Sequence, residues 1–520
     1  MMVLHGARSL RRRLIRPATA LLVAMCTLAL SPHTGSAQPA AGSGTARALS
    51  LADALALAAG ESEQVAIARA AALRAKGQLG QARSALLPQL GTTMNWQKQL
   101  QNQFAAIAER SSNNSSGGGG GDTTSAADNP ITRIFASQYN FNVGLSASQP
   151  LFTGGRTAAG IRAAKASREA ADIGITSAQA QVQLDVTQAY YDALLSDRLV
   201  AIAESALVQS ERTLRQVQLT RSVGSASEFE LIRARVTRDN QRPGWLQSRT
   251  NRDLAYVRLR QLLNVPPDQS LALTDSIAES PVSGPVATPE PITSVVVNVA
   301  EVLRLDPQVR AAVERVLAAS DTGVAVRAPV TQALKGVEVA QQQLRATKAQ
   351  RFPSIGANTN YQRLAYPVGV LPRSLGDFFP NWTVGIGLSY PFFSGGRLRG
   401  EVQAAEAGVQ EARQRLRLAQ EGATLDARQA VAQLTEAEAS WQASVGTAEQ
   451  AQRAYDIAEV RFREGISTQI ELSETRNQLQ QALANRAQAA RNLQVARKRL
   501  ELLPSLPLSQ GAPLITGPTR

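Results

Sequence analysis

Carboxylates are the side chains that could carry chemistry in this chain, because histidine and cysteine are almost absent from it. The 520 residues include two histidines, His5 and His33, and a single cysteine, Cys26. Glu471 and Glu474 form a carboxylate pair much farther along. Such a pair could in principle supply the general acid and the nucleophile of a glycosidase. No apolar, pocket-forming segment surrounds any such pair, so the sequence does not predict an enzyme.

Residues 1–37 have the composition of a secretory signal. Five arginines precede the apolar run from Ala18 to Leu30, and the small residues that a signal peptidase requires follow at 35–37. We predict cleavage before Gln38. A lipidated N-terminus at Cys26 is an alternative, which the large Met25 before it disfavours.

Cleavage would leave a mature chain without Cys or His. This excludes disulfides, thiolate nucleophiles and histidine-based acid/base or metal chemistry, and we predict no metal and no cofactor. Loss of the five arginines lowers the formal net charge from +14 to +9. The remaining basic residues alternate with acidic ones along the chain, so the sequence does not predict binding to nucleic acid.

A short motif occurs twice, as Pro-Leu-Phe-Thr-Gly-Gly-Arg at 150–156 and Pro-Phe-Phe-Ser-Gly-Gly-Arg at 391–397. The offset of 241 positions (391 minus 150) also relates Asp185 to Asp426 and Arg235 to Arg476, which indicates an internal duplication. The motif lacks the Gly-Lys-Ser/Thr ending of a phosphate loop, and we interpret it as a strand-to-helix junction. The junction residues are Pro150, Gly154, Gly155, Pro391, Gly395 and Gly396.

Four segments alternate apolar with polar or small residues, as β-strands do: 90–97, 140–151, 354–362 and 381–390. Each is roughly ten residues long, which suits a tilted transmembrane strand. No mature segment reaches the roughly 20 apolar residues of a membrane helix. A half-buried sheet of a soluble domain would give the same alternation and stays an alternative.

The strands form two predicted hairpins, at 88–152 and 353–393. From Pro88 to Pro150 the first spans 62 residues, and from Pro353 to Pro391 the second spans 38. The longer loop contains a serine-, asparagine- and glycine-rich tract at 111–121, which is tolerated where a loop faces solvent. Long loops on one side and tight junctions on the other are typical of outer-membrane barrels.

Two proline-free segments, 156–223 and 397–464, are predicted to be long helices that end at Gly224 and Gly465. A strict heptad of apolar or small residues predicts supercoiling against neighbouring helices, although an ordinary soluble coiled coil would show it too. Return helices are expected at 227–263 and 468–503. Pro243-Gly244 predicts a kink or break in the first of these. The first seam consists of Val182, Val186, Ala189, Ala193, Ser196, Val200, Ala203, Leu207, Ser210, Leu214 and Val217, and adding 241 gives the second.

The predicted organisation is a signal peptide at 1–37, a first structural repeat at 38–264, a proline-rich equatorial linker at 265–330, a second repeat at 331–505 and a flexible tail at 506–520. Each repeat contains a helix, a strand hairpin, a long helix and a return helix. Helix is expected to resume at about Val330 and to run to Arg351 before the third strand. Four strands cannot close a barrel, and lipid does not tolerate open sheet edges, so membrane strands would require oligomerisation.

From about residue 50 to 505 the chain resembles the TolC family of outer-membrane efflux and secretion channels. The junction motifs, the Leu87-Pro88 and Phe352-Pro353 strand entries, the two helix tips and the duplication carry this resemblance. It implies a homotrimer with a 12-stranded β-barrel in outer-membrane lipid and an α-helical coiled-coil tunnel in the periplasm. Its implied partners are a periplasmic adaptor protein and an inner-membrane pump or ABC exporter.

The resemblance also implies a pore constriction formed by Glu471 and Glu474, with Glu230 at the equivalent position of the first repeat. Phe462 stands where the family often has a tyrosine, and Ser467 where an arginine can lock the gate, so the closing bonds are expected to differ here. The residues expected at the periplasmic tip, gate and adaptor-docking surface are Val223, Gly224, Ser225, Phe462, Gly465 and Ser467.

The sequence therefore predicts a passive exit duct of a tripartite efflux pump or type I secretion system. A structural coiled-coil stalk or adaptor of the periplasm or cell surface is the alternative. The hairpins favour the duct, because a stalk has no use for them. The cargo is not indicated.

Overall fold

The computed structural model describes residues 47–100, 138–277, 326–367, 370, 372, 374, 376 and 378–508. The predicted signal peptide, the low-complexity tract 111–121, most of the 265–330 linker and the tail from 509 onward lie outside these ranges.

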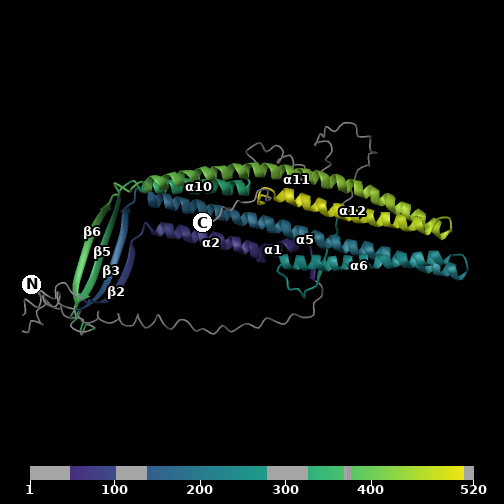
Figure 1. Ribbon diagram of the computed structural model, residues 1–520, viewed down its shortest axis with the longest axis horizontal. Coiled ribbons are helices and arrows are strands. Elements are labelled where there is room, and N and C mark those ends of the chain that lie inside the picture. The colour runs from purple at the N-terminus through teal and green to yellow at the C-terminus, as the bar shows by residue number, and fades with distance from the viewer. Residues whose placement is uncertain are drawn as a thin grey trace, which may run out of the picture.

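A small sheet lies at one end of an elongated helical body, and two helical hairpins turn at the other end (Figure 1). Two helices of 67 residues, α5 (Arg156–Ser222) and α11 (Arg397–Arg463), run between these ends. At about 1.5 Å per residue each is roughly 100 Å long. Shorter helices accompany them: α2 (Glu63–Ser84) and α10 (Ala328–Ala349) near the sheet, α6 (Glu228–Leu262) and α12 (Gln469–Leu502) toward the tips.

The predicted heptad seams are the buried faces of the two long helices. Val186, Ala193 and Val217 of α5 are buried, and no seam residue of α5 is exposed. In α11, Leu434 and Trp441 lie in the corresponding seam and are also buried. Small seam residues allow close helix approach, and burial of the larger ones stabilises the pairs by about 25 cal/mol per Å² of apolar area.

The sheet contains four antiparallel strands in the order β2-β3-β5-β6. Their bounds are Gln89–Lys98, Tyr139–Phe152, Ser354–Ala365 and Phe378–Ser389. The two predicted hairpins are thus joined through β3 and β5, whose register shifts between Pro150 and Phe152. Strands β2 and β6 are the edges of the sheet.

The two faces of this sheet differ in chemistry. One row across the strands consists of Thr92, Leu145, Tyr361 and Trp382, and the other face has the row Gly91, Ser146, Asn360 and Thr383. The apolar face is exposed in a single copy of the chain. Along β6, for example, Trp382, Val384, Ile386 and Leu388 are between 69% and 76% exposed.

A further core lies at mid-length, where two three-residue strands, β1 (Arg47–Leu49) and β4 (Leu271–Leu273), pair in parallel. With helix α1 (Leu51–Glu61) they pack on α5 and α6 around the fully buried Tyr190. The Tyr190 hydroxyl lies 3.0 Å from the Leu49 carbonyl oxygen and 3.0 Å from a carboxylate oxygen of Asp275. Sequence analysis did not predict this strand pair.

A break at Pro243-Gly244 is wrong, because α6 is one continuous helix with Pro243 inside it, and a kink at this point stays a prediction. Proline removes the hydrogen bond to the carbonyl of Asp239. Both residues are exposed, so water can solvate that carbonyl while the packing of α6 along α5 holds the helix together. Helix α10 begins slightly earlier than expected, with Pro329 in its first turn, where a missing N–H costs little.

No helix among the described residues has the length and apolar character needed to span a bilayer.

Candidate functional site at the helix tips

Both long helices end in the same left-handed glycine turn. Gly224 has φ +81°, and the Ser225 N–H donates to the Thr220 carbonyl at 2.9 Å. Gly465 has φ +73°, and the Ile466 N–H donates to the Arg461 carbonyl at 2.8 Å. These bonds satisfy carbonyls that have no partner at a helix end, and glycine adopts the required conformation without steric cost. Val223, Gly224, Ser225 and Gly465 are all exposed at the tips.

Glu230 caps the helix that returns from the first tip. Its backbone N–H donates to the Ser227 hydroxyl at 3.2 Å, and its carboxylate accepts from the Ser227 N–H at 3.0 Å. This reciprocal capping box satisfies N–H groups at the start of α6. Glu230 therefore has a structural role that the resemblance did not indicate.

Glu471 and Glu474 both lie near the start of α12. The Glu471 N–H donates to the Thr468 hydroxyl at 3.3 Å, and its carboxylate forms an ion pair with Arg461 of α11 at 3.1 Å. Glu474 is exposed. The two carboxylates are thus on the same helix and close to the tip, but only Glu471 has an arginine beside it in an ion pair recorded for the described chain.

The two hairpin tips are joined by contacts that are mostly uncharged. Phe462 packs against an apolar cluster of each hairpin, one containing Leu214 and Leu231 and the other Leu472. These contacts use the apolar ring of Phe462 and need no hydroxyl group. Ser467 is partly buried, and its hydroxyl has no hydrogen-bond partner.

Gln469 makes a polar link between the hairpins. It is buried on α12, and with the amide assigned so that both of its polar atoms are satisfied, it donates to the Glu230 carbonyl at 3.2 Å and accepts from the Ala234 N–H at 3.1 Å. Both of these backbone groups belong to α6. The amide therefore ties the start of α12 to the turn of α6 that carries Glu230.

Arg476 lies two turns along α12 and is only 3% exposed. Its Nε and Nη2 have no hydrogen-bond partner. Burial holds the pKa of the Arg476 guanidinium below its usual value, and the nearby Tyr455 opposes that shift. Burial likewise raises the pKa of the Tyr455 phenol. A buried cation thus lies between the two hairpins.

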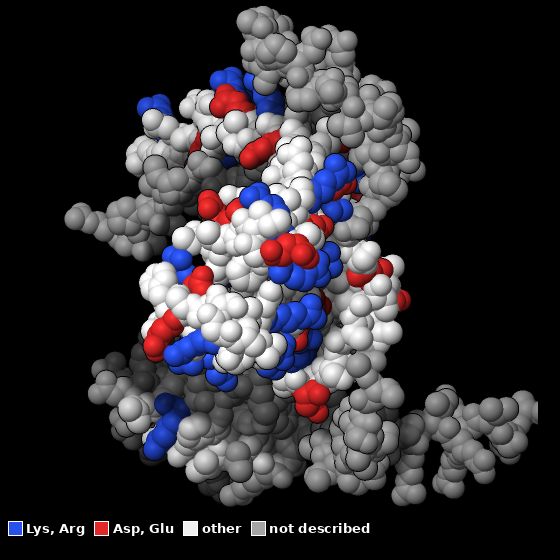
Figure 2. Space-filling view, turned by 90° about the vertical axis from the view of Figure 1, so that its right-hand side faces the viewer, with Lys and Arg blue, Asp and Glu red and all other residues white. Residues whose placement is uncertain are grey.

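The tip end of the molecule has a mixed charge. Basic and acidic side chains lie interspersed over the described helix ends (Figure 2). Besides the Arg461–Glu471 pair, Arg221 and Glu228 approach to 3.5 Å at the first tip. These exposed pairs contribute little to stability.

The junction glycines at the sheet end are all left-handed, with φ between +58° and +87°. Gly155 and Gly396 are the N-cap residues of α5 and α11. Gly154 is also crowded, since a Cβ there would lie 2.7 Å from Phe352 Cβ and 2.8 Å from the Ala349 carbonyl oxygen. Pro150 lies in β3 near its end, and Pro391 follows β6, so both prolines mark the change from strand to helix.

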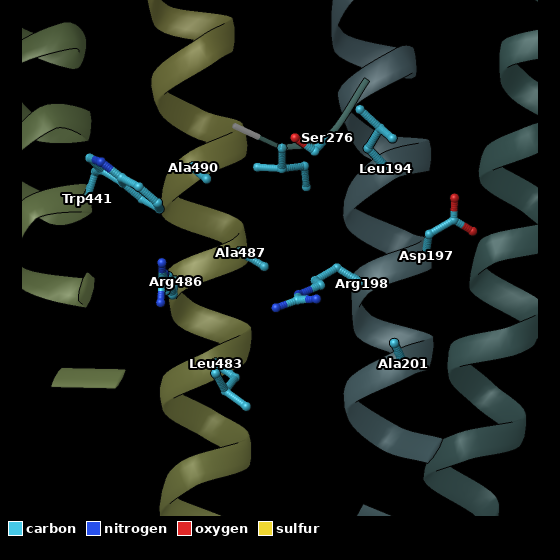
Figure 3. Close-up of a pocket in the computed structure, with 11 residues that line it drawn as sticks. Leu194, Asp197, Arg198, Ala201, Ser276, Trp441, Leu483, Arg486, Ala487 and Ala490 are labelled. Atoms are coloured by element: carbon cyan, nitrogen blue, oxygen red, sulfur yellow. The ribbon is translucent and has the colours of Figure 1, made fainter. Parts of the chain in front are cut away.

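A groove of about 670 Å³ lies between parts of α5 and α12 (Figure 3). Arg198 reaches from α5 toward α12, and Arg486 lies near Trp441, with its guanidinium 5.7 Å from a ring centre. Asp197 points toward α6, where it accepts from Arg252 and Tyr256 at 2.6 Å each. None of the site residues predicted from the sequence lines this groove.

A family model described as outer membrane efflux protein matches residues 54–265 and 325–503. The match includes both long helices, both tips and both junctions. The chain belongs to the outer membrane efflux protein family. As a member of that family this outer membrane efflux protein is an exit duct of the outer membrane, which confirms the main functional prediction.

Several solved structures have a similar fold. VceC from Vibrio cholerae is 18% identical, with a TM-score of 0.63 over 87% of this chain and 95% of its own. The CmeC outer membrane channel of Campylobacter jejuni is 16% identical, with 0.63 over 88% and 87%. MtrE from Neisseria gonorrhoeae, solved in an open state, is 17% identical, with 0.64 over 88% and 90%. No curated protein sequence matches the chain significantly.

The fold prediction of long helices with an antiparallel sheet is confirmed for this outer membrane efflux protein. Sequence reasoning did not identify Gln469 or Arg476 as residues between the hairpins. The offset of 241 does pair Arg476 with Arg235, which is exposed, but burial of only one of the two depends on how the hairpins pack.

Proposed function

We propose that three copies of this chain close into one tube, with a 12-stranded barrel in the outer membrane and a helical tunnel below it. The observation that carries the proposal is the sheet: one face apolar and exposed, the other lined by amides, hydroxyls and glycines, with an edge strand on each side. An apolar face suits lipid, and a polar face suits a water-filled lumen. Because lipid does not tolerate open edges, β6 of one copy would pair with β2 of the next.

The helices support the same arrangement. Toward the tips α6 packs on α5, α5 on α12, and α12 on α11, so α6 and α11 are the outer members of the row. Apolar side chains are exposed on both, including Phe229 and Ile232 of α6 and Ile457 of α11. Contact between α6 of one copy and α11 of the next would bury them in a closed, head-to-tail ring.

We further propose that the tips form the gate and the docking surface. Three copies would place six carboxylates, from Glu471 and Glu474, around a narrow pore and favour cations over anions. Glu230 would contribute as the cap of the neighbouring helix. Val223, Gly224, Ser225 and Gly465 are exposed at the tips, where a periplasmic adaptor could bind.

The duct would receive its substrate from an inner-membrane pump or ABC exporter and would itself be passive. Export of the chain would use the signal peptide at 1–37. Whether the cargo is a small drug or a secreted polypeptide depends on the pump, and we expect the genes beside this one to indicate which.

The test is extraction of the full chain from outer membranes in detergent. Before heating, the trimer should migrate on a gel well above the position of the unfolded monomer, and heating should convert it to the monomer band. The unheated trimer should also form discrete channels in a planar bilayer. A coiled-coil stalk would be soluble without detergent and would give no conductance, which would contradict the proposal.

A further inference from the structure

Arg476 is a buried cation at the junction of the two hairpins, and no ion pair neutralises it among the described residues. Asp426 is also buried, but it accepts from Arg327 at 2.7 Å and from Arg499 at 3.0 Å. Arg476 has two guanidinium nitrogens without a partner and takes part in no recorded ion pair. An unpaired buried charge is among the most costly features that a folded protein can contain.

The described residues that line the cavity beside Arg476 offer oxygen atoms but no carboxylate. A cavity of about 10 Å³ is close to the least space that holds one water. Its lining includes Arg476 and four residues with hydroxyl groups, together with Gln469, Ala234 and Leu472. The four are Ser210, Thr213, Thr237 and Ser473. Each of these hydroxyls donates its proton to a backbone carbonyl of its own helix. Their oxygens can accept from a water or from the guanidinium, but they cannot balance its charge.

This cavity lies where the two hairpins meet. Ser210 and Thr213 belong to α5, Thr237 to α6, and Ser473 and Arg476 to α12. Phe462 and Gln469 hold the same junction together through apolar contact and backbone hydrogen bonds. Separation of the hairpins would let water reach Arg476 and would remove its desolvation cost, whereas the Phe462 and Gln469 contacts would be lost.

We propose that Arg476 is a built-in bias toward separation of the two hairpins, opposed by Phe462 and Gln469, so that the closed tip is held only marginally. The gating consequence rests on the proposed function as a tip-gated duct. The effect of Arg476 on how tightly the two hairpins of one chain pack does not rest on that function.

The duplication provides a matched control for the test. Arg235 is the counterpart of Arg476 on α6 but is exposed. Arg476→Met removes the charge and keeps much of the side-chain length, Arg476→Gln is a second neutral variant, and Arg476→Lys retains a charge. Arg235→Met makes the same chemical change at the exposed position.

Two measurements on the full-length protein test separately whether Arg476 weakens the contact between the hairpins and whether it favours channel opening. Amide hydrogen exchange at 469–480 should slow by about tenfold or more in both neutral variants, with little change in Arg476→Lys and Arg235→Met. In planar bilayers the open probability of the neutral variants should fall by a similar factor. Unchanged or faster exchange in the neutral variants, or an equal effect of Arg235→Met, would overturn the proposal.

The bilayer result also distinguishes the two proposals. If the unmodified chain forms no channels, the proposed function fails while the exchange result still decides whether Arg476 weakens the contact between the hairpins. If channels form and exchange slows but the open probability of the neutral variants is unchanged, the bias does not act on gating and the inference is wrong in that part.

Discussion

Gly154 and Gly395 occupy equivalent places in the two repeats, yet only Gly154 is closely packed. Both need a left-handed backbone, which costs a non-glycine residue about 1–2 kcal/mol. At Gly154 an added Cβ would also clash with Phe352 and the Ala349 carbonyl, whereas at Gly395 it would meet nothing within 4 Å. We expect Gly154→Ala to destabilise by about 1–3 kcal/mol more than Gly395→Ala in thermal unfolding. Equal losses would show that backbone strain alone matters.

Glu471 and Glu474 should contribute unequally to ion selectivity. The Arg461 ion pair offsets part of the charge of Glu471, while Glu474 is exposed. We expect Glu474→Gln to raise anion permeability more than Glu471→Gln, and the double variant to abolish block by polycations. Reversal potentials in a salt gradient across a planar bilayer measure this. If the double variant keeps the ion preference of the unmodified chain, these glutamates do not line the constriction.

The limits of sequence reasoning at the residue scale are visible in Arg235 and Arg476. Both follow from the same ancestral position, and each stands in a helix rich in arginine and glutamine. Helix α12 packs between α5 and α11, whereas α6 has α5 on one side and an exposed face on the other. The burial of Arg476 therefore arises from tertiary neighbours, which no local pattern records. Glycine at the tips, in contrast, is predicted correctly because the turn geometry itself demands it.

At the scale of elements, Asp426 joins three helices and its repeat counterpart Asp185 does not. Asp426 of α11 binds Arg327, just before α10, and Arg499 of α12, and the Arg327–Asp426 pair is almost fully buried. Removing one partner of such a pair costs about 3–5 kcal/mol. We expect Asp426→Ala to lower stability by that amount and to speed proteolysis at the start of α10.

The matched variant is Asp185→Ala. Asp185 accepts from Gln181 of its own helix at 2.7 Å, and burial raises its pKa. Its carboxylate is thus poorly compensated at neutral pH, and its removal should cost far less. Equal destabilisation by the two variants would contradict this assignment.

Glu438 of α11 should make stability depend on pH. The Glu438 side chain is buried, its Oε2 has no hydrogen-bond partner, and burial raises its pKa although Arg497 opposes the shift. A raised carboxyl pKa means that stability falls as the pH rises above the ordinary value of 4.5 toward the folded-state pKa, and that the penalty persists above it.

Replacement of Glu438 by Met should therefore raise the melting temperature at pH 7.5, and the gain should shrink below pH 4.5. Glu436→Met, at an exposed position two residues earlier, serves as the control and should show no such pH dependence. A gain that is the same at both pH values would mean that added apolar contact, rather than ionisation, explains it.

The elements themselves were predictable to the extent that they are long and periodic. The seams of α5 and α11 and the alternation of the four sheet strands extend over many residues. The periodicity of the sequence therefore matches the faces that these elements present in the structure. Strands β1 and β4 have three residues each and no measurable period. Pro243 is a strong local signal for a helix break, yet α6 continues through it. The carbonyl that loses its hydrogen bond is exposed, so water can solvate it and the loss costs little.

At the scale of the whole molecule, the duplication gives the chain two similar hairpins with different surroundings. In one copy α12 is packed between α5 and α11, and α6 is at the outside of the row. A closed ring would give every hairpin two neighbours, one within its own chain and one from the next copy. The edge strands β2 and β6 and the exposed apolar residues of α6 and α11 are then parts of the same requirement, which is completion by identical chains.

The two sheet faces allow that requirement to be tested with one amino acid. Ile386 is 75% exposed on the apolar face of β6, and Thr383 lies on the polar face of the same strand. A lysine facing lipid near the bilayer midplane costs about 2–4 kcal/mol, in each of three copies, whereas a lysine facing a wet lumen remains hydrated. We therefore expect Ile386→Lys to abolish the heat-modifiable trimer, and Thr383→Lys to preserve it while lowering cation conductance. If Ile386→Lys assembles normally and Thr383→Lys does not, the faces are reversed, and the apolar surface meets something other than lipid.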